Sequence, residues 1–244
     1  MRSILYVSLL TTFFVLPLTA QTQPSLSQPP APTLEGISAP LTWQHTPEQW
    51  KIVNGKTLTI AGGKQTNWFA NPFDGAQDDN SPRLVFKPTE DFALSAKVDV
   101  DFRTKWDAGV LVLYVNDHLW AKLCFEMTVE NHPAIVSVVT RETSDDNNSI
   151  AIPGNSVYLK IAKAGSAIFF YTSQDGENWS IIRTFTLGKN PDLRIGFSSQ
   201  SPAGEGCVSV FSRIQYVPKA INLWSGKYFF LLPKGEPPAL PGWQ

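Results

Sequence analysis

The fold is decided by residues 106–127, which read WDAGVLVLYVNDHLWAKLCFEM. Residues 109–115 are apolar apart from a glycine and the hydroxyl of a tyrosine, and residues 116–118 form a polar turn. Residues 119–127 then alternate between apolar and polar side chains. Because successive side chains of a strand point to opposite faces, the stretch predicts a β-hairpin whose second strand has one buried face.

The two faces of this second strand differ in chemistry. The apolar side chains on one face are Ala121, Leu123 and Phe125. The other face carries an aromatic ring, a cation and an anion in one row, namely Trp120, Lys122 and Glu126. A plain solvated face rarely includes a tryptophan, so this row is a candidate ligand site. The same row is also explained by charges that pair across strands, at about 0.2–1 kcal/mol each, with Trp120 covering the sheet.

Length and composition favour one all-β domain. The chain has 244 residues, of which 43% are hydrophobic and 17% are charged, enough to bury one sizeable core. It contains 16 Gly and 19 Pro with short apolar runs between them, a composition typical of strands and turns. The formal net charge of −1 argues against a nucleic-acid partner or an anionic membrane surface.

The N-terminus has the pattern of a secretory signal. Arg2 precedes an apolar run over residues 4–16, and Ala20 provides a small residue for cleavage. The apolar run is shorter than the roughly 20 residues that a membrane span needs. We therefore expect residues 1–20 to be a signal peptide cleaved near Ala20, and the mature protein to be secreted or periplasmic without a membrane span.

The remaining chain divides by composition. Residues 21–41 are rich in Pro, Ser and Gln and are expected to form an extended tether. Residues 42–226 are expected to be the folded domain, and residues 227–244 a Pro-rich tail. About eleven or twelve short strands separated by turn sequences predict a sandwich or barrel. The polar stretches between residues 61 and 83 and over residues 142–149 are expected to be loops.

Several short motifs follow one another in order. They are Asp107-Ala108-Gly109, Trp120-x-Lys122-x-x-x-Glu126, Val138-Val139-Thr140-Arg141 and Ser173-Gln174-Asp175-Gly176-x-x-Trp179. In their order and spacing the chain resembles the domain-of-unknown-function 1349 family, which includes the fungal regulation-of-enolase proteins. The resemblance implies a concanavalin A-like jelly roll, a sandwich of two antiparallel sheets with one concave face. It implies no established reaction. The chain departs from the family at Cys124, where glycine is usual, and at residues 146–148, where a tryptophan is usual.

In sandwiches of this type the concave face is where sugars lie. A sugar needs a flat aromatic ring for its C–H face and charged or amide groups for its hydroxyls. The candidate residues on the face are Trp120, Lys122, Glu126, Asp99, Asp101 and Arg141, and those on its rim are Trp68, Trp106 and Asp107. The leading hypothesis is therefore an exported, non-catalytic carbohydrate-binding module.

Two alternatives remain open. A cryptic glycoside hydrolase or lyase needs two carboxyl groups about 5–5.5 Å or 6.5–9.5 Å apart. Asp99 and Asp101 lie about 6.5–7 Å apart along one strand face by strand rise. The Glu-x-Asp-x-x-Glu run typical of jelly-roll glucanases is absent, which disfavours the enzyme. The second alternative is a scaffold that binds a protein through one sheet. The oligomeric state is not indicated.

No cofactor is expected. The oxygen-rich segments at Asp74, Asp78 and Asp79 and at residues 145–147 would suit Ca²⁺, but they lack EF-hand spacing, so solvated loop charge is the favoured explanation. Export would permit a disulfide between Cys124 and Cys207, which requires Cα atoms within about 7 Å; otherwise the two are free thiols.

Overall fold

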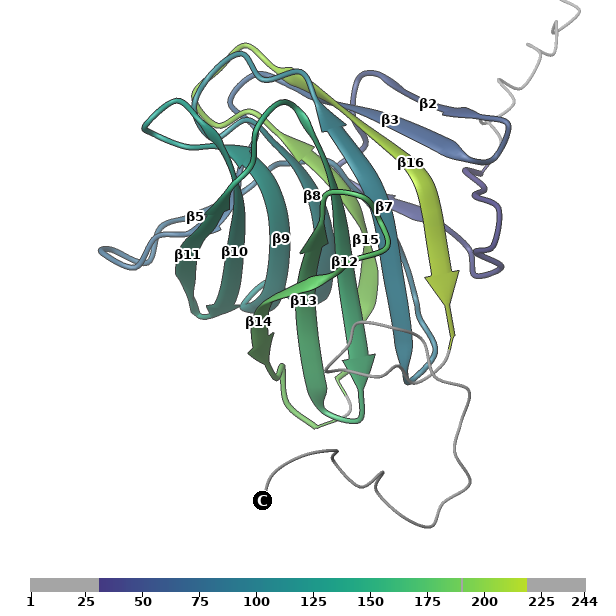
Figure 1. Ribbon diagram of the computed structural model, residues 1–244. Coiled ribbons are helices and arrows are strands. Elements are labelled where there is room, and N and C mark those ends of the chain that lie inside the picture. The colour runs from purple at the N-terminus through teal and green to yellow at the C-terminus, as the bar shows by residue number, and fades with distance from the viewer. Residues whose placement is uncertain (1–30, 190, 219–244) are drawn as a thin grey trace, which may run out of the picture. The chain divides into compact units, whose positions relative to one another are not determined.

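The structure, a computed structural model, describes residues 31–189 and 191–218 and shows an all-β sandwich. These residues form strands, turns and loops without a helix, and their two large sheets stack as layers in Figure 1. The predicted signal peptide and C-terminal tail lie outside the described residues. Within the described part, no helix is long and apolar enough to cross a bilayer. The predicted all-β jelly-roll sandwich is confirmed.

The first sheet has seven antiparallel strands and contains the hairpin predicted from residues 106–127. In spatial order the strands are β1 (Thr42–Gln44), β6 (Arg83–Phe86), β15 (Arg194–Gln200), β8 (Ala108–Asn116), β9 (Leu119–Met127), β10 (Pro133–Arg141) and β11 (Thr143–Ala151). The hairpin, β8 and β9, occupies the middle of this sheet, so both of its strands have neighbours on each side.

The second sheet also has seven antiparallel strands. In spatial order they are β14 (Ser180–Phe185), β13 (Ala167–Ser173), β12 (Ser156–Ala164), β7 (Phe92–Val100), β16 (Cys207–Val217), β3 (Thr57–Gly62) and β2 (Trp50–Val53). The β2–β3 hairpin turns at Asn54-Gly55, where both residues have positive φ angles of 52° and 67°. This backbone is the type I′ turn that an Asn-Gly pair favours.

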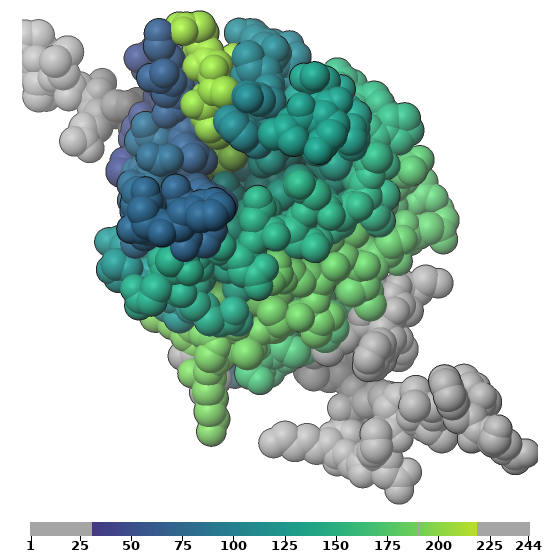
Figure 2. Space-filling view, turned by 90° about the vertical axis from the view of Figure 1, so that its left-hand side faces the viewer, coloured from purple at the N-terminus to yellow at the C-terminus, as the bar shows by residue number. Residues whose placement is uncertain are grey.

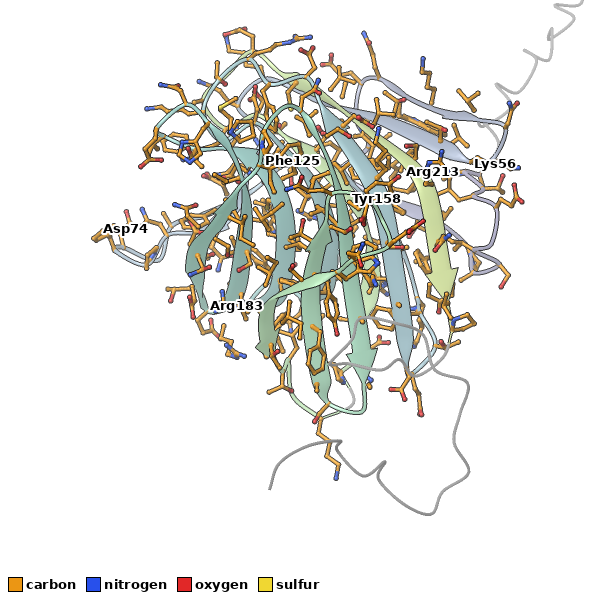
Figure 3. All side chains as sticks on the ribbon, viewed as in Figure 1. Lys56, Asp74, Phe125, Tyr158, Arg183 and Arg213 are labelled. Carbon is orange, nitrogen blue, oxygen red and sulfur yellow. The ribbon has the colours of Figure 1, made fainter. Side chains whose placement is uncertain are left out.

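The core lies between the two sheets and follows the predicted alternation. Phe125 of β9 is fully buried there, and its ring packs edge-on to Phe102 with centroids 5.0 Å apart. Figure 3 labels Phe125 inside the sandwich. At Gly109 a Cβ atom would lie 2.6 Å from Cγ1 of Val98, so only glycine lets β8 approach the opposite sheet this closely.

Two segments expected to be loops are strands instead. Residues 143–151 form β11, which pairs with β10 at the edge of the first sheet. Most of its side chains are exposed, so its sequence lacks the apolar alternation of a half-buried strand. The second segment contains β4 (Trp68–Ala70) and β5 (Gln77–Asp79), a hairpin of two three-residue strands, too short to show a period.

The segment before β1 also differs from expectation. The structure describes residues 31–41 of the predicted tether, and Leu34, Ile37 and Leu41 pack into the sandwich core with at most 7% of their surface exposed. Glu35 N donates a hydrogen bond to the carbonyl of Gly55 at 2.7 Å, which ties this segment to the β2–β3 turn. Three apolar side chains among prolines are enough to attach the segment, so the folded region starts before Thr42.

Replacement of Phe125 by Ala should destabilise the domain by about 3–5 kcal/mol, because a large ring is lost from a closely packed core. Chemical denaturation followed by tryptophan fluorescence would measure this change. Phe73 is the matched control, since its side chain is 97% exposed and Phe73→Ala should leave the unfolding midpoint almost unchanged. Equal losses in the two variants would contradict the assignment of Phe125 to the core.

Candidate functional site

The predicted row of polar side chains lies on the outer face of the first sheet, the face that points away from the core. Trp120 is in register with Thr140, Lys122 with Val138, and Val138 with Asp146 of β11. Trp120, Lys122 and Glu126 therefore share one face, as the alternation predicts. A ligand site on this row would need an exposed or half-exposed face, but the face is buried: only 1% of Trp120, 3% of Lys122 and 8% of Glu126 is accessible.

The β4–β5 hairpin covers this outer face of the first sheet and shields it from solvent. The ring of Trp68 stacks on that of Trp120, with centroids 4.0 Å apart, and the guanidinium of Arg83 lies 4.5 Å over Trp68. Ala70 N donates a hydrogen bond to Oγ of Ser144 on β11 at 3.0 Å. Trp68 is thus a buried packing residue rather than the rim residue expected. In Figure 2 the blue residues of this part of the chain lie against the teal strands.

A pocket of about 450 Å³ opens where this cover ends. Val136 and Val138 of β10 contribute apolar surface from the sheet, and Phe69 and Trp106 add two aromatic rings. The remaining lining residues are mainly polar, namely Asn67, Asp78, Lys122, Glu126, Asp146 and Gln200, with Pro202. The pocket thus combines aromatic surface with convergent polar groups, as small-molecule sites do.

Lys122 holds the β4–β5 hairpin against the first sheet at this pocket through hydrogen bonds. Its Nζ donates hydrogen bonds to the carbonyl of Trp68 at 2.7 Å and to Oε1 of Gln200 at 3.0 Å. The ammonium also lies 6.0 Å from the ring centroids of Phe69 and Trp120. A buried cation is tolerated when its donors are satisfied, and here they connect β9, β4 and β15.

Glu126 is the unusual group of the pocket. It is 8% exposed, and no described residue forms a hydrogen bond or ion pair with its carboxyl group. Burial raises the pKa of Glu126 to about 8; the Lys122 ammonium opposes this shift and the Asp146 carboxylate adds to it. Burial likewise raises the pKa of Asp146, again opposed by Lys122. Glu126 is therefore largely a neutral acid at pH 7, able to donate one hydrogen bond and accept others.

Trp106 stands at the edge of the pocket in a strained conformation. Its φ angle of 69° is uncommon for a bulky residue, and its side chain is 39% exposed. Asp107 holds the turn: its carboxylate accepts hydrogen bonds from the backbone N–H groups of Arg103 and Thr104 at 2.8 Å and from Ser201 Oγ at 2.6 Å. Asp107 is fully buried, so it positions the predicted rim residue Trp106 and is not itself on the rim.

Three predicted residues lie elsewhere. Asp99 is on β7 in the second sheet, on the face away from the core, where its Oδ1 is 3.3 Å from Nζ of Lys97. Asp101 follows that strand and pairs with Arg103 at 2.6 Å. Arg141 is in register with Leu119 on the core-facing side of β9, and its Nη2 donates to the carbonyl of Thr186 at 2.6 Å. Alternation assigns a strand's two faces, but it does not say which sheet the strand joins.

The structure shows both cysteines as free thiols. Cys124 and Cys207 are free and buried, Cys124 on the covered outer face of the first sheet and Cys207 in the core between the sheets. Burial raises the pKa of both thiols, that of Cys207 to about 11. Within residues 31–189 and 191–218, no group of three His, Cys, Asp or Glu side chains is placed to hold a metal ion.

The acidic segments considered for calcium have protein partners. Asp79 pairs with Arg83 at 2.6 Å, and Oδ2 of Asp78 accepts a hydrogen bond from Asn67 at 2.9 Å. Figure 3 shows Asp74 at the tip of the β4–β5 hairpin, projecting away from the sandwich.

The sequence reading missed Phe69, Gln200 and Asp146 as members of one pocket. Asp146 was placed in a loop because β11 looks polar throughout, although its alternate residues Ser144 and Asp146 face the same side of the sheet. Gln200 ends β15, which is distant in sequence from β9 and is separated from it in the sheet by β8. The signal for Phe69 was its position beside Trp68, since both residues pack against the same outer-face cluster.

Comparison with models of known protein families assigns the chain to one of them. The model of the family described as "Protein of unknown function (DUF1349)" matches residues 43–219. The chain belongs to this family. The resemblance stated from the sequence is thereby confirmed. A search of curated proteins found no match.

Solved structures share the fold of this DUF1349 protein. A functionally unknown protein from Saccharomyces cerevisiae is 19% identical with a TM-score of 0.68, and the match covers 73% of this chain and 96% of that one. The GH43 protein BlXynB from Bacillus licheniformis is 16% identical with a TM-score of 0.55, and the match covers 72% of this chain but 37% of that protein. GH43B of a Bacteroides ovatus xyloglucan PUL is 16% identical, with a TM-score of 0.56 and coverage of 82% and 41%. The chain thus spans less than half of these GH43 proteins.

Replacement of Trp120 by Ala should lower the free energy of unfolding by about 3–5 kcal/mol, because the ring is buried and stacked. Trp106→Ala is the matched control, since that ring is half-exposed and its loss should change stability little. Thermal and chemical unfolding of both variants would measure the difference, and an unaffected Trp120→Ala protein would refute the packing role.

Glu126 should make stability depend on pH. Its pKa in the folded protein, about 8, lies above the ordinary value of 4.5, so its contribution is fully present below pH 4.5 and is lost as the pH rises towards 8. In Glu126→Gln this contribution is absent, and the melting temperature should fall less between pH 4.5 and 8 than in the wild type. Thermal melts across that range test this; parallel curves would show that Glu126 ionises normally.

Proposed function

We propose that this DUF1349 protein is an exported carbohydrate-binding module that holds its ligand in the pocket between Trp106 and Glu126. The observation that carries the proposal is one arrangement: a half-exposed Trp106, held at a positive φ angle, beside a buried carboxyl group without a described partner. Strained residues that the surrounding structure holds in place are typical of functional sites.

The chemistry of the lining suits a sugar. Trp106 and Phe69 supply aromatic surface for the C–H face of a pyranose ring, while Gln200, Glu126 and Asp146 supply groups that hydrogen-bond hydroxyls. The signal pattern of residues 1–20 supports export, which would place the pocket where extracellular or periplasmic glycans occur. The fold shared with parts of the GH43 proteins is compatible with this proposal and does not by itself indicate a ligand.

A glycoside hydrolase or lyase is the second candidate, and the state of Glu126 favours it. A carboxyl group that stays protonated near neutral pH is the kind of general acid that glycoside cleavage uses, and Asp146 lines the same pocket as a second carboxyl group. The binding module is preferred because the chain lacks the Glu-x-Asp-x-x-Glu run typical of jelly-roll glucanases. Release of reducing ends or unsaturated sugars by the purified wild-type protein would reverse this preference.

A glycan array probed with the purified protein should identify at least one carbohydrate ligand, and Trp106→Ala should weaken binding to it at least about tenfold, or about 1.4 kcal/mol. The reason is loss of the aromatic surface that contacts the ring. Phe73→Ala is the matched control, because this exposed aromatic does not line the pocket and its loss should leave affinity unchanged. An array without any carbohydrate binding, or a Trp106→Ala protein with full affinity, would contradict the proposed function.

A further inference from the structure

We propose that the pocket selects glycans that carry a protonated amino group, such as oligomers of glucosamine. This inference rests on the proposed function and specifies its ligand class. It starts from the charges of the lining. Three carboxyl groups reach the pocket from separate strands, Asp78 from β5, Glu126 from β9 and Asp146 from β11, against one cation, Lys122.

The single cation is largely unavailable to a ligand. Lys122 is 3% exposed, and its ammonium donates to the carbonyl of Trp68 and to Oε1 of Gln200. These bonds hold the hairpin against the sheet, so a ligand that displaced them would loosen the cover over Trp120. Two of the acids are more accessible, because Asp78 and Asp146 are exposed residues at the mouth of the pocket. Glu126 is buried beneath them, and no described residue donates a hydrogen bond to its carboxyl group. An incoming molecule therefore meets an excess of carboxyl groups.

An ammonium group would correct this imbalance. Burial raises the pKa values of both Glu126 and Asp146, and the Asp146 carboxylate raises that of Glu126 further. The Lys122 ammonium lowers both values without cancelling the effect of burial. A cation held between carboxylates favours their ionised forms and lowers their pKa values. The aromatic rings at this pocket already lie near cations: the Lys105 ammonium is 4.8 Å from the Trp106 ring centroid and the Lys122 ammonium is 6.0 Å from that of Phe69. A glycan bearing carboxylate or sulfate groups would instead meet the acidic side chains of Asp78 and Asp146 at the pocket mouth.

The test compares two oligomers that differ at the amino group. Calorimetric titration at about pH 6 should show the glucosamine tetramer binding at least about tenfold more tightly than the N-acetylglucosamine tetramer, because only the former carries ammonium groups. Asp146→Asn should reduce this preference at least several-fold. Asp99→Asn is the matched control, since it makes the same charge change on the other sheet, where Asp99 faces Lys97, and it should keep the full preference.

Proton release provides a second readout that folding defects do not mimic. At about pH 6 the free protein holds a proton on Glu126, and an ammonium placed beside it should expel that proton. The measured heat should therefore vary with the ionisation enthalpy of the buffer, and Glu126→Gln should reduce this variation. The other titratable groups facing Glu126 are Lys122, Cys124 and Asp146, of which Asp146 remains in the variant as an internal reference.

The outcomes separate this inference from the proposed function. Equal or tighter binding of the N-acetylated tetramer, or an equal loss of preference in Asp99→Asn and Asp146→Asn, would overturn the selection for amines and leave carbohydrate binding standing. Binding of neither tetramer, with another neutral or acidic glycan bound on the array, would overturn it in the same way. Absence of all carbohydrate binding would overturn both.

Discussion

The stacking of Trp68 on Trp120 is the interaction on which the rest of the outer face depends. A tryptophan in the middle of a sheet, on the face away from the core, has to be shielded from water, and among the described residues the ring that stacks on it belongs to Trp68 of β4. That single contact brings the β4–β5 hairpin across the first sheet. It puts the carbonyl of Trp68 within reach of Lys122, so the cover is closed by a hydrogen bond as well as by apolar contact.

The pocket follows from where this cover stops. Trp68 and Phe69 are neighbours on one short strand: Trp68 is buried, whereas Phe69 packs against the same outer-face cluster but is only partly buried and lines the pocket. Further along β9 the hairpin no longer covers the sheet, and Glu126 lies in the space between the cover and the turn that carries Trp106. The same strand therefore contributes a packing residue, a fastening cation and an unpartnered acid at Trp120, Lys122 and Glu126.

The sequence predicts those parts of the structure that local patterns determine. Alternation over β9 identified Phe125 as a core residue and placed Trp120 and Glu126 on one face, because a period of two depends only on backbone geometry. The alternation did not predict that the outer face of β9 is buried. The β4–β5 hairpin covers that face, and its three-residue strands are too short to show a period. The alternation also failed for Asp99, whose strand has the expected alternation but joins the other sheet. β11 was missed because an edge strand with exposed side chains has no apolar face to reveal it.

Glu126 suits the proposed site but does not favour the stability of the fold. An apolar residue would fit the neighbourhood of Val136 and Cys124 without the cost of burying a carboxyl group. Lys122 does not remove that cost, because its donors are directed to the carbonyl of Trp68 and the amide oxygen of Gln200. Local rules are most often broken where a protein acts rather than where it only folds. A buried acid beside an open pocket, next to a strained Trp106, is therefore better explained by a ligand than by the stability of the sandwich.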